Sequence, residues 1–253
     1  MTYADNPVTL APKVVWSEGM YIAPHHFQMQ SRYFEDSIRF TNSAFWFAPY
    51  GVTGVEFDAE ALQNGLIVLL HARGLLPDGL PFNIPETDAP LHSRSITDEF
   101  PSARDAVTVL LGVPLRKPRG LNCTLDYAST GESPDTRYVA DTRVQPDENT
   151  GCDERPIRVG RKRLRLLLDT ESADGLVTLP LARILRNDAG HLVYDAAFVP
   201  PVLQIHASQR LMLLATSLIE LLDEKSPCIS MRRRRAPPCW AGSPPPAGTP
   251  AAC

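Results

Sequence analysis

Short apolar runs separated by turn residues are the feature that most constrains how this chain can fold. They recur from Phe45 to Val199 without alternating helical patterns, and the run 52–57 alternates apolar and polar residues. Such spacing is typical of strands in a sandwich or barrel and argues against a doubly wound parallel sheet. The chain is therefore expected to be mainly β. The predicted strands are 52–57, 66–76, 107–113, 137–144, 157–168, 176–185, 191–193 and 197–199.

One turn signal is strong enough to predict a hairpin. Pro77, Asp78 and Gly79 lie between the apolar run 66–76 and Leu80-Pro81-Phe82. Proline presets one backbone dihedral of a tight turn and glycine accepts a positive φ.

The segment that precedes these strands is predicted to hold one short strand and one helix. Val14, Val15 and Trp16 form an apolar run that is expected to be a strand, and Pro24 occupies a place that suits the first turn of a helix. Phe27, Phe34 and Ile38 follow at spacings of seven and four residues, which predicts an amphipathic helix over 24–40.

A second helix is predicted over 208–225. Its leucines recur at spacings of three, four and three residues, which is a heptad-like seam. The seam is too rich for a lone surface helix and favours a helical bundle or coiled coil. The helix is expected to end at Ser226-Pro227, because proline cannot continue it. The seam residues are Leu211, Leu214, Leu218 and Leu221.

The last segment, 227–253, has an unusual composition. It holds seven of the 24 prolines, three of the five cysteines and four arginines, but no Asp, Glu, Leu, Val or Lys. Such a segment cannot form a core and is expected to be disordered. Its residue types are those of GC-rich codons read out of frame, which suggests a frameshift near Ser226. The alternative is a native basic, proline-rich tail.

Charge and composition exclude several classes of function. Without the tail, the chain carries 21 basic and 29 acidic groups, a net charge of −8, which disfavours general nucleic-acid binding. The longest uncharged stretches are interrupted and too short to span a membrane, and the N-terminus lacks the features of a secretory signal. The cysteine count is odd and no pair has CxxC spacing, so neither a disulfide framework nor a zinc site is expected. These features predict a cytoplasmic protein.

The sequence contains no recognisable catalytic, cofactor or metal motif. His25 and His26 are adjacent and would diverge on a helix, so they are not expected to share a metal. The acidic segment 146–155 lacks the pattern of a calcium loop and is interpreted as a solvated turn. A basic run is expected to lie on a solvent-exposed strand face, with a protein interface as the second interpretation. That run contains Arg158, Arg161, Lys162, Arg163 and Arg165.

Residues 14–30, VVWSEGMYIAPHHFQMQ, carry a family resemblance. They resemble the opening signature of TssK, the baseplate subunit of the bacterial type VI secretion system also called ImpJ or VasE. Weaker matches follow in order at the 77–79 hairpin, at 179–183 and at 198–201, so the resemblance covers about 13–225. The signature positions are Trp16, Glu18, Gly19, Met20, Pro24, His26, Phe27 and Gln28.

The resemblance implies a structural adaptor without catalysis or cofactors. It implies a β-sandwich shoulder over 1–200, including 13–40, that binds the wedge proteins TssF and TssG. It also implies a helical neck that begins at 201–226 and trimerises through the leucine seam. The family's head domain docks onto the TssL, TssM and TssJ membrane complex, and nothing after Ser226 resembles it. The chain is therefore expected to be a truncated adaptor.

Some alternatives stay open at this stage. Trp16, Met20 and Phe27 are expected to fill a core at the strand-to-helix corner, whereas Glu18 and His26 could face a partner. A carbohydrate- or ligand-binding sandwich related to phage tail proteins is the first alternative function. Its only local aromatic cluster, around Phe45-Trp46-Phe47 and Tyr50, is explained more simply by core filling. A hydrolase with a site assembled from distant residues is the second.

Overall fold

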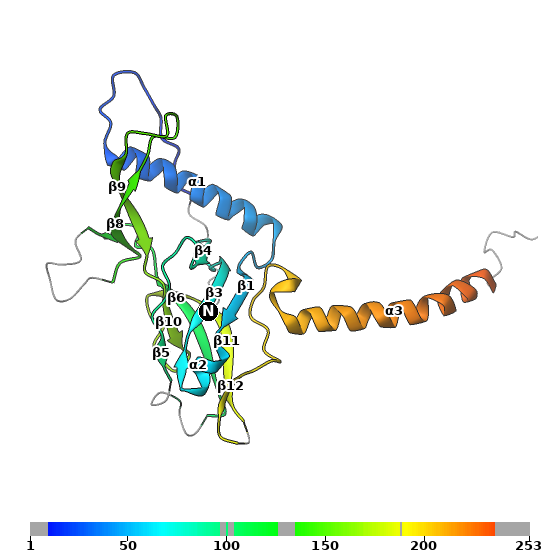
Figure 1. Cartoon of the computed structure of the whole chain (residues 1–253). Coiled ribbons are helices and arrows are strands. Elements are labelled where there is room, and N and C mark those ends of the chain that lie inside the picture. The colour runs from blue at the N-terminus through cyan, green and yellow to red at the C-terminus, as the bar shows by residue number, and fades with distance from the viewer. Residues whose placement is uncertain (1–9, 97–99, 101–103, 126–134, 188, 236–253) are drawn as a thin grey trace, which may run out of the picture. The chain divides into compact units, whose positions relative to one another are not determined.

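The computed structural model describes residues 10–96, 100, 104–125, 135–187 and 189–235. The chain divides into two compact units, Met1–Arg210 and Leu211–Cys253. The described strands all belong to the first unit, together with helices α1 (Pro24–Phe45), α2 (Ala59–Gln63) and η2 (Ile205–Ala207). The mainly β fold expected from the sequence is confirmed (Figure 1).

Two antiparallel sheets form the body of the first unit (Figure 1). One has the strand order β1-β3-β4 and the other the order β10-β6-β11-β12. The strands of the first sheet are β1 (Gly51–Phe57), β3 (Leu69–Leu75) and β4 (Pro81–Ile84). Those of the second are β6 (Ala106–Pro114), β10 (Arg165–Leu168), β11 (Leu176–Arg186) and β12 (Leu192–Tyr194).

The two sheets share one apolar core, as in a sandwich. Along β6 every second side chain is fully buried, because successive residues of a strand point to opposite faces. The first sheet supplies Val52, Ala72, Phe82 and Ile84 to the same cluster. The predicted β-sandwich is confirmed. The buried β6 residues are Val107, Val109, Leu111 and Val113.

The predicted hairpin joins β3 to β4. The NH of Leu76 donates to the carbonyl of Leu80 (2.9 Å), and the NH of Gly79 donates to the carbonyl of Leu76 (2.8 Å). Gly79 has a φ of +84°, which explains the need for glycine here. The carboxylate of Asp78 accepts from the NH of Leu80 (3.2 Å) and also pairs with the buried guanidinium of Arg137.

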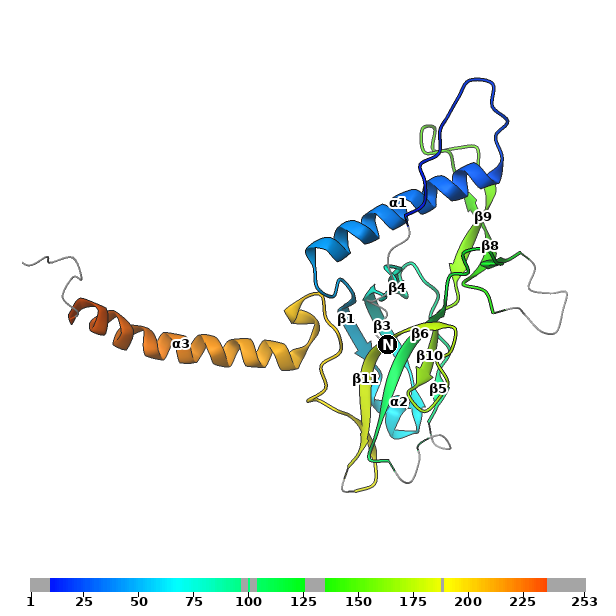
Figure 2. The same cartoon turned by 180° about the vertical axis from the view of Figure 1, so that it is seen from behind.

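A third group of strands forms a ribbon that extends beyond the two main sheets (Figures 1 and 2). It has the order β7-β8-β9, with β7 (Cys123–Thr124) parallel and β9 (Arg155–Lys162) antiparallel to β8 (Tyr138–Gln145). The single strand predicted over 157–168 is therefore wrong. The chain leaves β9 at Arg163 and enters β10 in a different sheet, so the basic residues do not share one face.

Other sequence predictions also need correction. The run 66–76 is split between β3 and the short strand β2 (Leu66–Ile67), which pairs with β5 (Arg94–Ser95). Neither 14–16 nor 197–199 forms a strand, because neither segment pairs with a described strand. Helix α2 was not predicted. Asp58 begins it by accepting hydrogen bonds from the NH groups of Glu60 and Ala61, both at 2.9 Å.

The helices α1 and α3 are longer than the sequence predicted. Helix α1 begins at Pro24 as expected but continues to Phe45. Helix α3 (Gln209–Arg235) passes through Pro227, so the predicted end at Ser226-Pro227 is wrong. A proline removes one helical hydrogen bond and can kink a helix without ending it. Residues 236–253, the rest of the predicted disordered tail, lie outside the described residues.

Residues 201–210 belong to the first unit, although the sequence assigned them to the neck. Both backbone groups of Val52 form hydrogen bonds with this segment. Its NH donates to the carbonyl of Pro201 (2.8 Å), and its carbonyl accepts from the NH of Leu203 (2.9 Å). None of the helices within the described ranges is long and apolar enough to cross a bilayer.

The buried pair of Arg137 and Asp78 ties the ribbon to the hairpin and gives a first prediction. Arg137 is 5% exposed and also donates to the carbonyl of Pro114 (3.2 Å). Arg137→Ala leaves a buried carboxylate without its cation, so we expect the free energy of unfolding in urea to fall by about 3–5 kcal/mol.

The matched control is Arg143→Ala on the exposed part of β8. Arg143 pairs with Asp141 at 4.0 Å with both side chains about half exposed, so its loss should change stability by about 0.5 kcal/mol or less. Equal destabilisation by the two variants would contradict the burial of the Arg137 pair.

Candidate protein-interaction surfaces

The signature residues at the N-terminus form a compact corner on the surface. Ser17 to Gly19 turn the chain, with Gly19 at a φ of +76°. The indole ring of Trp16 lies 5.9 Å from the ring of His26 and 6.0 Å from that of Phe27, measured between centroids. The indole NH (Nε1) of Trp16 donates a hydrogen bond to Oε1 of Gln30 (2.9 Å). Gln30 was not singled out in the sequence, where nothing marks it as a partner of Trp16.

His26 has a structural role at the start of α1. Its Nδ1 atom accepts a hydrogen bond from the NH of Ala23 (3.1 Å), as the third helical residue does in a capping box. Met20 also contributes locally, because its sulfur lies 3.4 Å from the NH of Ser17. The side chains of Glu18 and Gln28 are exposed and form no hydrogen bond or ion pair within the described part of the chain. The corner thus joins Trp16, Met20, His26 and Phe27 but not Glu18 or Gln28.

The corner does not fill a core, which corrects the sequence interpretation. Trp16 is 46% exposed and Phe27 is 58% exposed. The aromatic cluster at the end of α1 is also exposed at Phe45, Trp46 and Phe47, and of its members only Tyr50 packs against the core. These side chains are therefore available to contact another molecule.

Helix α1 turns the side that carries Asp36 toward the rest of the first unit. Asp36 is the buried residue of the helix, and its carboxylate accepts from the NH of Ala11 (3.2 Å) and pairs with Arg116 at 3.5 Å. The side chain of Arg39 lies against Gly79 of the β3–β4 hairpin. Polar contacts therefore hold this helix in place.

One row of apolar side chains on α1 points away from the body. Phe34 and Ile38 are each two residues from Asp36, roughly 160° around the helix, and Phe27 and Phe45 are each nine residues away, roughly 180°. All four are more than half exposed. We call Phe27, Phe34, Ile38 and Phe45 the apolar stripe. An amphipathic helix ordinarily turns this side to a core, so the stripe is a candidate interface.

The leucine seam of α3 is the second candidate interface. Leu214, Leu218 and Leu221 are exposed by 45%, 60% and 49%, and Leu211 is partly buried. The neighbouring Ile219 is exposed to a similar degree. Exposed leucines at heptad spacing favour burial against another helix.

The pockets offer little chemistry. One of about 380 Å³ is lined by Thr53, Gly54, His71, Arg73, Asn83, Glu86, Gln204 and His206, and its closest pair is His71 with Glu86 at 3.4 Å. Among the described residues, no three His, Cys, Asp or Glu side chains are grouped to hold a metal.

Burial raises the pKa of the Tyr194 phenol well above its usual range, and the Asp58 carboxylate raises it further, so this hydroxyl stays neutral.

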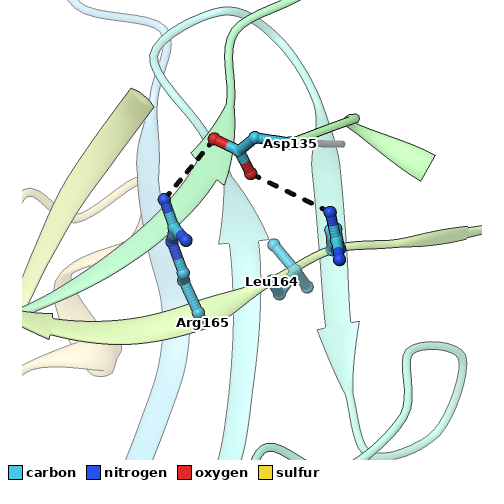
Figure 3. Close-up of a pocket in the computed structure, with 4 residues that line it drawn as sticks. Asp135, Leu164 and Arg165 are labelled. Carbon is cyan, nitrogen blue, oxygen red and sulfur yellow. Dashed lines mark ion pairs between the residues drawn. The ribbon is translucent and has the colours of Figure 1, made fainter. Parts of the chain in front are cut away.

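A second pocket of about 380 Å³ lies where β9 gives way to β10. It is lined by Asp135, Arg163, Leu164 and Arg165. Figure 3 shows the Asp135 carboxylate between two guanidinium groups, at 4.0 Å from Arg163 and 3.8 Å from Arg165. Both distances are long for ion pairs, so one carboxylate is shared loosely between two cations.

Comparison with known proteins identifies the family. Residues 26–240 match the family described as bacterial type VI secretion, VC_A0110, EvfL, ImpJ and VasE. The chain is 33% identical over 226 residues to the type VI secretion system baseplate component TssK1 of Pseudomonas aeruginosa. This chain belongs to the TssK family. The alignment covers 87% of this chain and 48% of TssK1, so the chain spans about half the length of that relative.

Solved structures agree with this assignment. The chain is similar to a chain of the TssK-TssF-TssG baseplate subcomplex with a TM-score of 0.76 and 25% identity, covering 88% of this chain and 73% of that one. It is similar to a crystal structure of TssK with a TM-score of 0.73 and 28% identity, covering 90% of this chain and 51% of that one. The family expected from the N-terminal signature is confirmed.

The orientation of α1 predicts different losses of stability for substitutions on its two sides. Asp36→Ala removes a buried hydrogen-bond acceptor and should lower the free energy of unfolding by about 1–3 kcal/mol. Phe34→Glu changes an exposed side chain and should alter it by about 0.5 kcal/mol or less. Urea denaturation of both variants measures the difference. A larger loss for Phe34→Glu would mean that the apolar stripe faces the core.

Proposed function

We propose that this chain is a type VI baseplate adaptor that acts by binding proteins, with its first unit holding a wedge of TssF and TssG. The outward apolar stripe of α1 is the observation that supports this most. None of the described core residues lies on α1, and all four stripe residues are more than half exposed, so the stripe is not part of the core. Exposed apolar patches of this kind are typical of protein interfaces. A relative solved as part of a TssK-TssF-TssG subcomplex adds support.

Within this proposal the signature residues position the stripe. Gly19 turns the chain, His26 binds the first turn of α1, and Trp16 packs beside Phe27. The corner therefore fixes the start of the helix, while Glu18 and Gln28 remain accessible to the wedge. The adaptor would act at the cytoplasmic face of the membrane, as a baseplate does.

The seam of α3 is proposed to form the start of a trimeric neck. A single helix that exposes leucines along one side is marginal in water, and association of copies would bury the seam. Binding rather than catalysis is favoured because the described pockets lack a paired nucleophile and base, and the similar proteins are baseplate components.

Wedge binding should depend on the apolar stripe. Phe34→Glu combined with Ile38→Glu places two charges in the centre of the stripe, so we expect affinity for purified TssF–TssG from the same bacterium to fall about tenfold or more. Interferometry with the full chain immobilised measures this. Ser43→Glu is the matched control, because it adds a charge to an exposed position of α1 off the stripe and should leave affinity unchanged.

The two parts of this proposal fail in different ways. If the unaltered chain does not retain the wedge at micromolar concentration, the adaptor function is wrong. If it retains the wedge and the double variant binds equally well, the adaptor function stands and the assignment to α1 is wrong. Urea denaturation of each variant must match the unaltered chain before affinities are compared.

Self-association should depend on the leucine seam. Leu214→Glu with Leu218→Glu should convert a trimer into a monomer of about 27.9 kDa, measured by light scattering across a range of concentrations. Thr216→Glu is the control, since Thr216 lies off the seam and its hydroxyl only donates to the carbonyl of Met212 (3.0 Å). A monomeric unaltered chain, or a trimer that survives the double variant, would contradict the proposed neck.

A further inference from the structure

We propose that the outer edge of β9 is a docking edge for an extended acidic segment of a partner protein, which adds to the ribbon as a further strand. The inference goes beyond the proposed function, because it involves neither the apolar stripe nor the leucine seam. It rests on the free edge of β9, on the direction of its backbone groups and on its charge.

The outer edge of β9 pairs with no described strand. In the sheet order β7-β8-β9, strand β9 pairs with β8 on one side and with no described strand on the other. Most of its residues are exposed, including Ile157 at 48%, so the described chain covers neither face of the outer ribbon. Figures 1 and 2 show the ribbon extending past the two main sheets. An uncovered edge with unpaired backbone groups is a template for another strand.

Backbone geometry indicates which groups face outward. The NH of Arg163 donates to the carbonyl of Arg137 (3.0 Å), directly beyond the ladder that pairs Lys162 with Tyr138. In an antiparallel ladder such pairs alternate, so residues 155, 157, 159 and 161 bond to β8 and the even-numbered residues point outward. Pro156, which has no NH, falls in the outward set. The edge therefore offers the NH groups of Arg158, Gly160 and Lys162.

The charge of the edge selects the kind of partner. Arg158 and Arg161 are exposed, lie on opposite faces of β9 and form no ion pair within the described residues. Lys162 is already paired with the buried Asp88 at 3.0 Å. The strand leads into the pocket in which Arg163 and Arg165 share Asp135. Since the chain without its last segment has a net charge of −8, this basic strip is a local exception that favours an acidic segment.

Two other occupants are disfavoured by the same features. Pairing of β9 with β9 of a second copy would bring like charges together, which is unfavourable across strands. A nucleic acid would meet the carboxylates at the ribbon tip, where Asp147, Glu148, Asp153 and Glu154 cluster. Those acids also position a peptide, because they repel an acidic segment from the tip and leave the stretch 158–162 as the favourable register.

Amide exchange in the full chain tests the edge directly. The probe is the capped peptide Thr-Glu-Val-Glu-Val-Glu-Thr. The control peptide carries Lys in place of each Glu. In the free chain we expect the NH groups of Val159 and Arg161 to exchange slowly and those of Arg158 and Gly160 quickly. Saturating acidic probe should slow exchange at Arg158 and Gly160 about tenfold, with no effect of the Lys peptide.

Two substitutions separate the backbone from the charge. Arg158→Thr keeps the outward NH and removes the cation, so affinity for the acidic probe should fall about threefold and lose part of its salt dependence. Arg158→Pro removes both the outward NH and the cation and should abolish binding. Slow amide exchange at Val159 and Arg161 in this variant would show that β9 still pairs with β8. If the proline variant disrupts the ladder, the threonine variant and the exchange pattern decide the test.

Several outcomes would overturn the proposal. These are equal exchange at inward and outward amides, equal binding of the Lys peptide, and full affinity in an intact Arg158→Pro chain. Protection that appears without peptide as protein concentration rises would assign the edge to a second copy. Protection by a single-stranded oligothymidylate at physiological salt, in place of the peptide, would assign it to nucleic acid.

Discussion

The two main sheets bury each other's apolar faces, and this closed core determines the role of everything outside it. Its members come from both sheets, from α2 and from the strands and loops between them, and none of the described core residues lies on α1. Helix α1 therefore attaches through a buried carboxylate, Asp36, instead of an apolar face. Phe27, Phe34 and Phe45 lie on the side of the helix opposite to Asp36 and are more than half exposed.

The strands of the sandwich could be predicted from the sequence because each signal is local. Alternation along β1, the aliphatic run of β6 and the 77–79 turn each fix a short piece of structure without reference to distant residues. The break between β9 and β10 could not be predicted in this way. An unbroken apolar and basic run continues through Arg163, and only the choice of sheet partner divides it.

The sequence predicted which residues share a side of each helix, but not which way that side faces. Periodicity shows that Phe27, Phe34 and Ile38 share one side of a helix, but it cannot show what covers that side. The expectation that Phe27 fills a core was wrong, since it is 58% exposed, whereas Asp36 on the opposite side is buried and pairs with Arg116. The corner was found through family resemblance, whereas Gln30, which binds Trp16, carries no signal in the sequence.

The three exposed surfaces differ in chemistry, so each favours a different kind of partner. The apolar stripe of α1 and the leucine seam of α3 both depend on burial of apolar area, which favours tight contacts but discriminates weakly. The edge of β9 depends on backbone pairing and on cations, so it discriminates by charge and by an extended shape. The stripe and the edge belong to the same unit. A partner that presents a helix-binding groove and an acidic strand together would satisfy both, and its affinity would exceed what either surface provides alone.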